Sequence, residues 1–589
     1  MLIIGGGIVG AGVARDAAMR GLKTGLVEQH DFAFGTSSRS SRLLHGGLRY
    51  LAQGRVGLVH EASVEKKVIH HIAPHLAEPL PFIFPTYRGN RNWVLWQLKI
   101  GVKIYDLLCG GRNLGKSTWL NTDEVMCKVP GLQKDALSGA VRYYDGFTND
   151  ARLTLDTLRS AANAGATILN YCRFQNAKRV DGRSNPLTPA LSPSAGAREN
   201  NPPSPGKPET ADSPVTTEYT ANSQRHFPLP RGGGEGQGEG ELGVGEHRTS
   251  NIEHPTSNAT ISQVSTQSLG PIWECEIVDQ LSGRKSTVRA RTIINATGPW
   301  ADKLPHSRVK LRLTKGIHLV VRRSRVPVPE TVVMTEGKRI LFAIPWGERT
   351  ILGTTDTDYD GPPDKVTTSA DDVDYVLQIA NHFFPSAKLT GQDVLSTWAG
   401  LRPLLADPNG KPSDLSRSHE ITNPESGWWD VAGGKLTTYR LMAEQTVDQI
   451  VKQRLRSVSA AGEPAGRAAP LPCRTALEPL LPATETANVS GILPPEFTRR
   501  AVEHYVAREW AIHLDDVMMR RTSWHYYFPD AAQKAERVAD WMGELLGWSV
   551  AQRTEELARY HKSAGSTLGT EPATIPPSQP HDQPAHSMV

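Results

Sequence analysis

A chain of 589 residues is long enough for two or more domains with a large hydrophobic core. Its 66 Lys and Arg residues nearly balance its 61 Asp and Glu residues. The resulting net charge of +5 argues against a nucleic-acid partner and is compatible with an anionic substrate or membrane surface. Five scattered cysteines without a C-x-x-C pair argue against a disulfide scaffold, a zinc site or an iron–sulfur cluster bound within this chain, and they suit a reducing compartment.

The first thirty residues predict a nucleotide-binding unit. MLII is typical of a short buried strand, although its shortness favours a natural start further upstream, and GGGIVG places Gly5, Gly7 and Gly10 in the G-x-G-x-x-G pattern. A helical repeat follows, and a second apolar run ends in Glu28, 18 residues after Gly10. Such glycines let a pyrophosphate approach a helix N-terminus, and such an acid binds a ribose hydroxyl. The alternative is a glycine-rich turn with Glu28 as a surface acid.

Two further segments favour a flavin over a nicotinamide. The stretch TSSRSS contains Thr36, Ser37 and Ser41, which are short hydroxyl donors suited to a flavin's pyrophosphate and ribityl chain. The segment RTIINATG predicts a buried strand over 292–295 and then a tight turn at Gly298.

Near its end the chain is predicted to return to the same site. WWDVAGGKLTTYR indicates a strand, the pair Gly433-Gly434 and a helix that begins near Lys435. The positive N-terminus of that helix would stabilise the anion of a reduced flavin. A nicotinamide enzyme has no need for such a return.

The stretch SSRLLHGGLRYL contains two adjacent glycines, Gly46 and Gly47, followed by Arg49. Adjacent glycines weaken a helix or strand, so we expect another group to approach the backbone closely at this point.

Seven segments together resemble the FAD-dependent glycerol-3-phosphate dehydrogenases, which belong to the D-amino-acid-oxidase-like flavoproteins. They are GGGIVGAG, SSRLLHGGLRYL, INATGPW, KGIHLVV, IPWGERTILGTTDTDYDG, WAGLRPL and GGKLTTYR. The resemblance covers about 1–181 and 272–450, and a C-terminal helical piece matches more weakly.

The resemblance implies an α/β fold in which a discontinuous Rossmann-like FAD-binding domain adjoins an antiparallel-sheet substrate domain and a C-terminal helical domain. The expected ranges are 1–182 for the FAD-binding domain with part of the substrate cap, 183–270 for a disordered low-complexity insertion, 271–309 for more of the FAD-binding domain, 310–394 for the substrate domain, 395–455 for the FAD-binding return, 490–562 for the helical domain and 563–589 for a disordered tail.

The resemblance also implies how these residues act. Arg49, Tyr50, Arg402 and Arg417 would bind the substrate phosphate, which suits the planar fork of arginine. Surface or loop ion pairs are the alternative for the arginines. The residues expected to bind FAD are Gly5, Gly7, Gly10, Glu28, Thr36, Ser37, Ser41, Gly46, Gly47, Gly298, Gly434, Lys435, Leu436 and Thr437.

The implied reaction moves a hydride from C2 of glycerol 3-phosphate to flavin N5 and yields dihydroxyacetone phosphate. His45 and His318 are the candidate bases, because histidine titrates near neutral pH, and each could equally be a satisfied structural histidine. Asp356 would order the site through hydrogen bonds. Quinone is the expected electron acceptor, with dioxygen or a partner subunit as alternatives. An amine or amino-acid oxidase of the same superfamily, or a flavin-binding protein without turnover, are the competing functions.

The helix predicted over 93–108 either packs on the core or lies on a membrane interface. With no signal peptide and no apolar run of the roughly 20 residues that span a bilayer, we expect a cytoplasmic enzyme that binds peripherally to the inner face of the cell membrane. A homodimer is also expected. We expect the insertion to interrupt the turn of a strand pair and to have no function; a Pro-rich interaction segment is the alternative.

Overall fold

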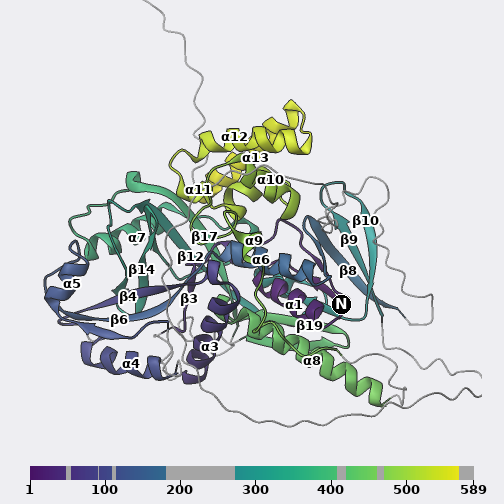
Figure 1. The fold of residues 1–589 in the computed structure, drawn as a ribbon, viewed down its shortest axis with the longest axis horizontal. Helices are drawn as coiled ribbons and strands as arrows, with labels where there is room; N and C mark the ends of the chain where they lie inside the picture. The colour runs from purple at the N-terminus through teal and green to yellow at the C-terminus, as the bar shows by residue number, and fades with distance from the viewer. Residues whose placement is uncertain are drawn as a thin grey trace, which may run out of the picture. The chain divides into compact units, whose positions relative to one another are not determined.

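The computed structural model describes residues 1–47, 55–90, 92–108, 114–180, 272–406, 419–460 and 470–568 (Figure 1). All of them belong to one compact unit, Met1–Asn201 with Ser268–Val589, whereas the second unit, Pro202–Gln267, lies outside the described residues. The predicted insertion therefore lies outside them as well. So do three predicted site residues, Arg49, Tyr50 and Arg417.

The first sheet is the expected nucleotide-binding sheet, assembled from distant parts of the chain. Its central strands are parallel, and β18 pairs antiparallel at one edge. Helices α1 (Ile8–Met19), α6 (Asp150–Asn163) and α8 (Tyr439–Ala460) pack together beside it, and the central strand β1 is correspondingly short and fully apolar. The strand order is β18 (His419–Glu425), β19 (Trp428–Gly433), β11 (Ile293–Asn295), β1 (Leu2–Ile4), β2 (Gly25–Val27) and β7 (Thr167–Leu169).

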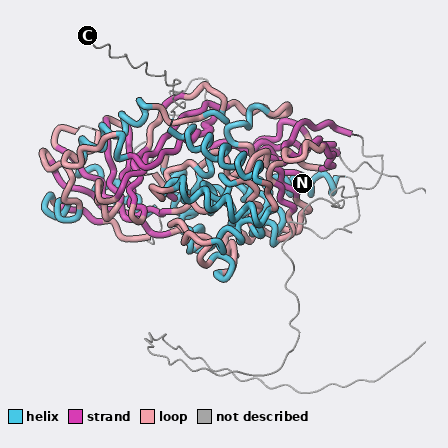
Figure 2. Tube along the Cα trace, turned by 90° about the horizontal axis from the view of Figure 1, so that it is seen from above, coloured by secondary structure: helices cyan, strands magenta, loops and turns pink. Residues whose placement is uncertain are grey.

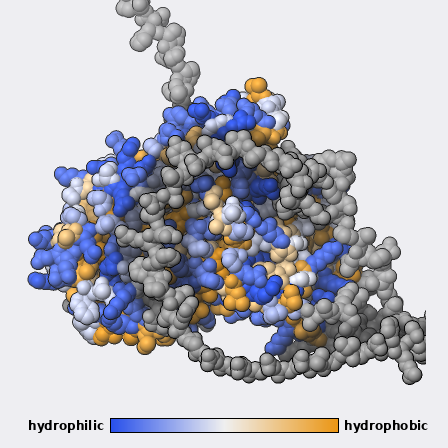
Figure 3. All heavy atoms as spheres, in the orientation of Figure 1, coloured by the Kyte–Doolittle hydropathy of each residue, from blue (hydrophilic) through white to orange (hydrophobic). Residues whose placement is uncertain are grey.

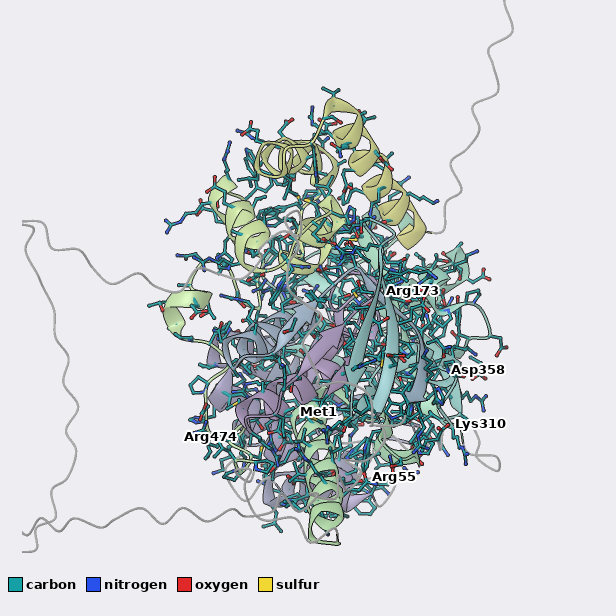
Figure 4. The ribbon with its side chains drawn as sticks, turned by 90° about the vertical axis from the view of Figure 1, so that its right-hand side faces the viewer. Met1, Arg55, Arg173, Lys310, Asp358 and Arg474 are labelled. Atoms are coloured by element: carbon teal, nitrogen blue, oxygen red, sulfur yellow. The ribbon has the colours of Figure 1, made fainter. Side chains whose placement is uncertain are left out.

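The second sheet is mostly antiparallel, as expected for the substrate domain. Only the pair β13–β4 is parallel. Lys310 and Asp358 lie toward its outer edge in the side view (Figure 4). The order is β16 (Thr357–Asp358), β12 (Leu311–Arg322), β15 (Arg349–Gly353), β14 (Arg339–Trp346), β13 (Thr331–Glu336), β4 (Glu78–Tyr87), β6 (Leu137–Phe147) and β3 (Leu43–Leu44), with β17 (Val394–Leu405) on β12 and β5 (Thr118–Leu120) on β6.

One predicted boundary is wrong. The sequence predicts the FAD-binding return from residue 395, but residues 395–405 belong to β17, which pairs with β12 from Leu311↔Leu405 to Val321↔Val394. This long ladder places the segment WAGLRPL in the substrate sheet, because its backbone hydrogen bonds go to β12.

The strand pair predicted on either side of the insertion is confirmed. Strand β8 (Cys172–Val180) pairs antiparallel with β9 (Ile272–Asp279), and β10 (Lys285–Ala290) completes a third sheet. Val180 lies directly opposite Ile272 in the register, so the two strand ends that flank the insertion are neighbours.

The remaining helices complete the unit. Helix α4 (Leu95–Leu108) begins two residues later than predicted, α3 (Val56–Ile72) lies against it, and α5 (Thr122–Lys128) and α7 (Ala370–Phe383) lie by the second sheet. Figure 1 shows the C-terminal helices above the two large sheets, and the view from above in Figure 2 shows helices over the middle of the molecule with strands on both sides. These helices are α9 (Ala483–Thr486), α10 (Arg499–Arg508), a π-helical turn (Asp516–Arg521), α11 (Trp524–Tyr527), α12 (Ala531–Leu546) and α13 (Val550–Leu568).

The C-terminal helices are bound to the first sheet by buried charges. Asp31, just after β2, accepts hydrogen bonds from Arg520 and Arg521. Burial would raise the pKa of Asp31, but the charges of these two arginines outweigh it and lower that pKa. Arg152 of α6 likewise pairs with Glu509 at 2.5 and 2.8 Å. The last helix runs to Leu568, beyond the predicted boundary at 562.

Candidate active site

A cavity of about 390 Å³ lies between the two large sheets. It opens at the carboxyl ends of β1, β2, β11 and β19, where parallel sheets usually bind ligands. Its other wall comes from β12 and β17 of the second sheet. Fourteen of the predicted site residues line it: Gly5, Gly7, Glu28, Thr36, Ser37, Ser41, His45, Gly298, His318, Arg402, Gly434, Lys435, Leu436 and Thr437.

The N-terminus of α1 faces this cavity and can bind an anion. Gly7 is the N-cap residue and has no side chain to cap the helix, and the first turn contains no acidic residue. The backbone N–H of Ile8 donates to Ser37 Oγ at 3.0 Å, which places a hydroxyl at the helix end. Gly5, with φ of +109°, could not carry a Cβ, which would lie 2.6 Å from Ala296 O. This combination of donors and helix dipole suits a pyrophosphate.

Gly10 does not line the cavity. A Cβ at Gly10 would lie 2.0 Å from the carbonyl oxygen of Gly5, so glycine is required there for the helix to pack closely on the turn. The third glycine of the fingerprint therefore serves helix–strand packing.

Glu28 is held at the cavity wall by the backbone. Its Oε2 accepts from Gly6 N–H at 2.7 Å and its Oε1 accepts from His30 N–H at 2.9 Å. Burial raises the pKa of Glu28, and these two hydrogen bonds oppose that effect. A carboxylate that is held in this way retains lone pairs for a ribose hydroxyl.

His318 of β12 is a neutral buried imidazole. Its Nε2 lies 2.8 Å from Ser41 Oγ, and its ring stacks on Trp398 at a centroid distance of 5.1 Å. Burial, and then the positive charges of Arg402 and Arg42, lower the pKa of His318 well below 6.5. Burial thus favours the uncharged imidazole of His318 over its protonated form.

Arg402 of β17 lies on the same wall as His318 and is oriented by the segment 354–356. One guanidinium nitrogen donates to Thr354 Oγ1 at 3.0 Å and to Thr355 O at 3.1 Å, and the other donates to Asp356 Oδ1 at 3.3 Å. A Cβ at Gly316 would lie 2.4 Å from that guanidinium, so the glycine of KGIH leaves room for it. The side chain is one-fifth exposed and can contact a ligand in the cavity.

The His45–Gly46 turn is held by the C-terminal return. His45 N–H donates to Thr437 Oγ1 at 3.1 Å, and Lys435 Nζ donates to Gly46 O at 3.4 Å. The helix predicted to begin near Lys435 starts as a 3₁₀ turn over Leu436–Thr438 and continues as α8.

In the structure, the close approach to the double glycine is made by a side chain of the protein itself, and the expected contact of Gly46 and Gly47 with FAD stays a prediction. Gly46 and Gly47 are absent from the described lining of the cavity. A Cβ at Gly46 would lie 2.5 Å from the hydroxyl of Tyr105, so the close approach is by a side chain of α4. Gly47 has φ of +82°, which favours glycine on conformational grounds.

Most residues of the cavity lining were not predicted from the sequence, and two unpredicted residues bear on the site: Arg39, which lines the cavity, and Tyr105, which contacts Gly46. Tyr105 looked like an ordinary core aromatic of an amphipathic helix, and no local signal separates it from one. Arg39 also lines the cavity, and its guanidinium lies 5.3 Å from the centre of the Phe34 ring. A cation within the hydroxyl-rich TSSRSS was a signal that could have identified it.

Comparison with known proteins supports the interpretation of this cavity as an FAD site. Residues 1–197 and 258–446 match the family described as FAD dependent oxidoreductase (DAO), and residues 484–553 match the C-terminal domain of alpha-glycerophosphate oxidase. Proteins named aerobic glycerol-3-phosphate dehydrogenase from Staphylococcus aureus strains USA300 and NCTC 8325 / PS 47 are each 33% identical over 463 residues, which is 77% of this chain and 67% of theirs.

Among solved structures, the glycerol-3-phosphate dehydrogenase from Bacillus halodurans complexed with FAD is similar with a TM-score of 0.60 and 26% identity, covering 96% of this chain and 94% of that one. The helix N-terminus, the hydroxyls and the acid of the cavity suit the FAD that such proteins bind. The chain belongs to the FAD dependent oxidoreductase (DAO) family.

Proposed function

We propose that the protein oxidises sn-glycerol 3-phosphate to dihydroxyacetone phosphate with FAD as its cofactor. The observation that carries this proposal is Arg402, a guanidinium fixed at the cofactor cavity beside His318. A fixed guanidinium matches the geometry of a phosphate dianion. The names of the Staphylococcus aureus and Bacillus halodurans relatives support the same substrate. Bound FAD supplies the hydride acceptor.

The chain's own residues bind the substrate and take its proton. Arg402, together with the predicted Arg49 and Arg417, binds the phosphate and thereby orients C2. The C2 hydroxyl proton moves to His318 through Ser41: Ser41 Oγ accepts it and passes its own hydroxyl proton to His318 Nε2, which lies 2.8 Å away. The surrounding burial keeps the imidazole neutral, so it is ready to accept this proton. His45, which lines the same cavity, is the alternative base.

Anaerobic mixing tests the proposal directly. Purified protein is mixed with sn-glycerol 3-phosphate, with glycerol, or with a D- or L-amino acid, while the absorbance of the oxidised flavin is recorded. We expect rapid bleaching with glycerol 3-phosphate and very slow bleaching with glycerol, because glycerol lacks the dianion. Equal rates with both would assign Arg402 another task, and bleaching only by an amino acid would overturn the proposed substrate.

We also propose that electrons pass to a quinone and that the enzyme, cytoplasmic and homodimeric, attaches peripherally to the membrane. Helix α4 supports the attachment, because it exposes large apolar side chains: Trp96 is 61% exposed and Leu107 74%. Trp119 lies beside it, with the ammonium groups of Lys99 and Lys103 over its ring at 5.4 and 5.7 Å. Figure 3 shows hydrophobic surface along the lower edge, where α4 lies.

This mixture of tryptophan, aliphatic and lysine side chains is typical of a helix that lies in an anionic membrane interface. No helix in the described part of the chain is long and apolar enough to cross a membrane. Flotation with anionic vesicles should carry the wild-type protein upward and leave Trp96→Ser/Leu107→Ser behind, whereas a Leu281→Ser variant, changed at an exposed leucine between β9 and β10, should float normally. Peroxide formation in air without any response to a quinone analogue would contradict the proposed acceptor.

A further inference from the structure

A chain of hydrogen bonds connects the His45–Gly46 turn to the protein interior through Tyr105. The Gly46 N–H donates to the Tyr105 hydroxyl at 3.0 Å. That hydroxyl donates in turn to Asp145 Oδ1 at 2.5 Å. Lys66 Nζ donates to the same carboxylate oxygen at 2.8 Å. Three elements, α3, α4 and β6, thus meet at one backbone amide.

These groups are buried among apolar side chains. Tyr105 and Lys66 have no exposed surface and Asp145 is 2% exposed, and Tyr105 belongs to the same hydrophobic cluster as Leu98, Val102 and Tyr143. A buried ion pair is weak evidence for stability, because well-packed apolar residues often serve as well. A buried network of this kind instead fixes the positions of its side chains, because each polar group must keep its partners inside the protein.

The group that this network orients is the turn beside the cavity. Thr437 holds the backbone of His45, Lys435 holds the carbonyl of Gly46, and Tyr105 holds the N–H of Gly46 from the opposite side. His45 and Lys435 both line the cavity, and Arg49 follows three residues after Gly46 in the sequence. The glycine itself is needed for this contact, because any Cβ would meet the Tyr105 hydroxyl.

We propose that Tyr105 is a positioning residue of the oxidation: its hydroxyl, oriented by Asp145 and Lys66, holds the His45–Gly46 turn so that His45 lines the cavity beside Lys435. This inference rests on the proposed function for its kinetic consequences. Its structural part, the restraint of the Gly46 amide by the Tyr105 hydroxyl, is independent of which substrate is oxidised.

Two variants disrupt the contact between Gly46 and Tyr105, one at each partner. Tyr105→Phe removes only the hydroxyl and leaves the Lys66–Asp145 pair in place, and Gly46→Ala forces the turn away from Tyr105. We expect both to retain FAD and a near-wild-type melting temperature, but to reduce flavin with glycerol 3-phosphate about 10- to 100-fold more slowly at saturating substrate. Tyr143→Phe is the matched control: this ring packs against Tyr105 with centroids 6.2 Å apart, and its hydroxyl makes no hydrogen bond to any described residue.

Hydrogen–deuterium exchange of a peptide spanning Leu43–Gly47 gives a second measurement that needs no substrate. In Tyr105→Phe, the Gly46 amide should exchange about three- to tenfold faster, as expected for the loss of one neutral hydrogen bond, and in Tyr143→Phe it should be unchanged. Unchanged exchange, wild-type rates in Tyr105→Phe, or an equal loss in Tyr143→Phe would each overturn the proposal. If the wild-type enzyme failed to oxidise glycerol 3-phosphate, the proposed function would fall, while the exchange comparison would still decide the role of Tyr105.

Discussion

Replacing Arg402 with alanine tests the reasoning about the substrate most directly. In the structure its guanidinium has three partners in the segment 354–356 and reaches the cavity from β17. Asp356 is 38% exposed, so water can solvate its carboxylate once the arginine is gone, and the fold should tolerate the change. Arg402→Ala should therefore lower the activity toward glycerol 3-phosphate and leave the stability of the fold nearly unchanged.

The size of this decrease in activity follows from the interaction between Arg402 and the substrate phosphate that is lost. Removing one charge-assisted partner of a desolvated phosphate costs about 2–4 kcal/mol, which corresponds to a decrease of about 30- to 1000-fold in kcat/KM. Turnover of glycerol, which has no phosphate to lose, should change little. The ratio of kcat/KM for glycerol 3-phosphate to that for glycerol should therefore fall by the same factor.

The assay is steady-state reduction of an artificial electron acceptor with each substrate, alongside the FAD content and melting temperature of each variant. Arg312→Ala is the matched control: Arg312 lies on the neighbouring strand β12 and pairs with Asp358 at the exposed edge of the sheet, away from the cavity. A variant Arg402→Ala that keeps the wild-type preference for the phosphorylated substrate would refute the assignment, as would an equal loss in Arg312→Ala.

Three further results are expected. Glu28→Ala should raise the Kd for FAD, measured by flavin fluorescence on reconstitution, more than it changes the substrate KM, because the carboxylate borders the nucleotide end of the cavity. Burial lowers the pKa of His525 from 6.5 to about 4, so folding keeps this histidine neutral; its stabilising contribution is present above pH 6.5 and is lost as the pH falls toward 4. Between pH 7 and pH 5 the free energy of unfolding should fall by about 2 kcal/mol more in the wild type than in His525→Gln, as measured by urea denaturation. Joining Gly182 to Gly270 by a short turn should leave FAD content and turnover unchanged, because the strand ends beside the insertion are already paired; loss of flavin in the shortened protein would show that the segment packs on the enzyme.

Local features could be predicted from the sequence because they depend on residues close together in the chain. The strand, turn and helix around Gly5 and Gly7 follow from backbone conformations that only glycine adopts easily and from the apolar period on either side. Glu28 could be placed because a strand of the βαβ unit ends at it. The ends of β8 and β9 beside the insertion could also be placed, because the amino-acid composition changes abruptly there.

Non-local pairing could not be predicted. The strand β17 reads equally well as part of either sheet, and only its ladder to β12 assigns Arg402 to the substrate wall. The partner of Gly46 is Tyr105, 59 residues away, and a helical tyrosine among aliphatic residues resembles any core aromatic.

The cofactor class, the order of the nucleotide-binding elements and fourteen of the residues that line the cavity could be predicted from the sequence alone, because these are properties of short segments. Only the folded structure shows the lowered pKa of His318, the side chain that contacts Gly46, and the attachment of the C-terminal helices through Asp31. Those outcomes depend on burial and on charges brought together from distant segments, and both exist only after the chain has folded.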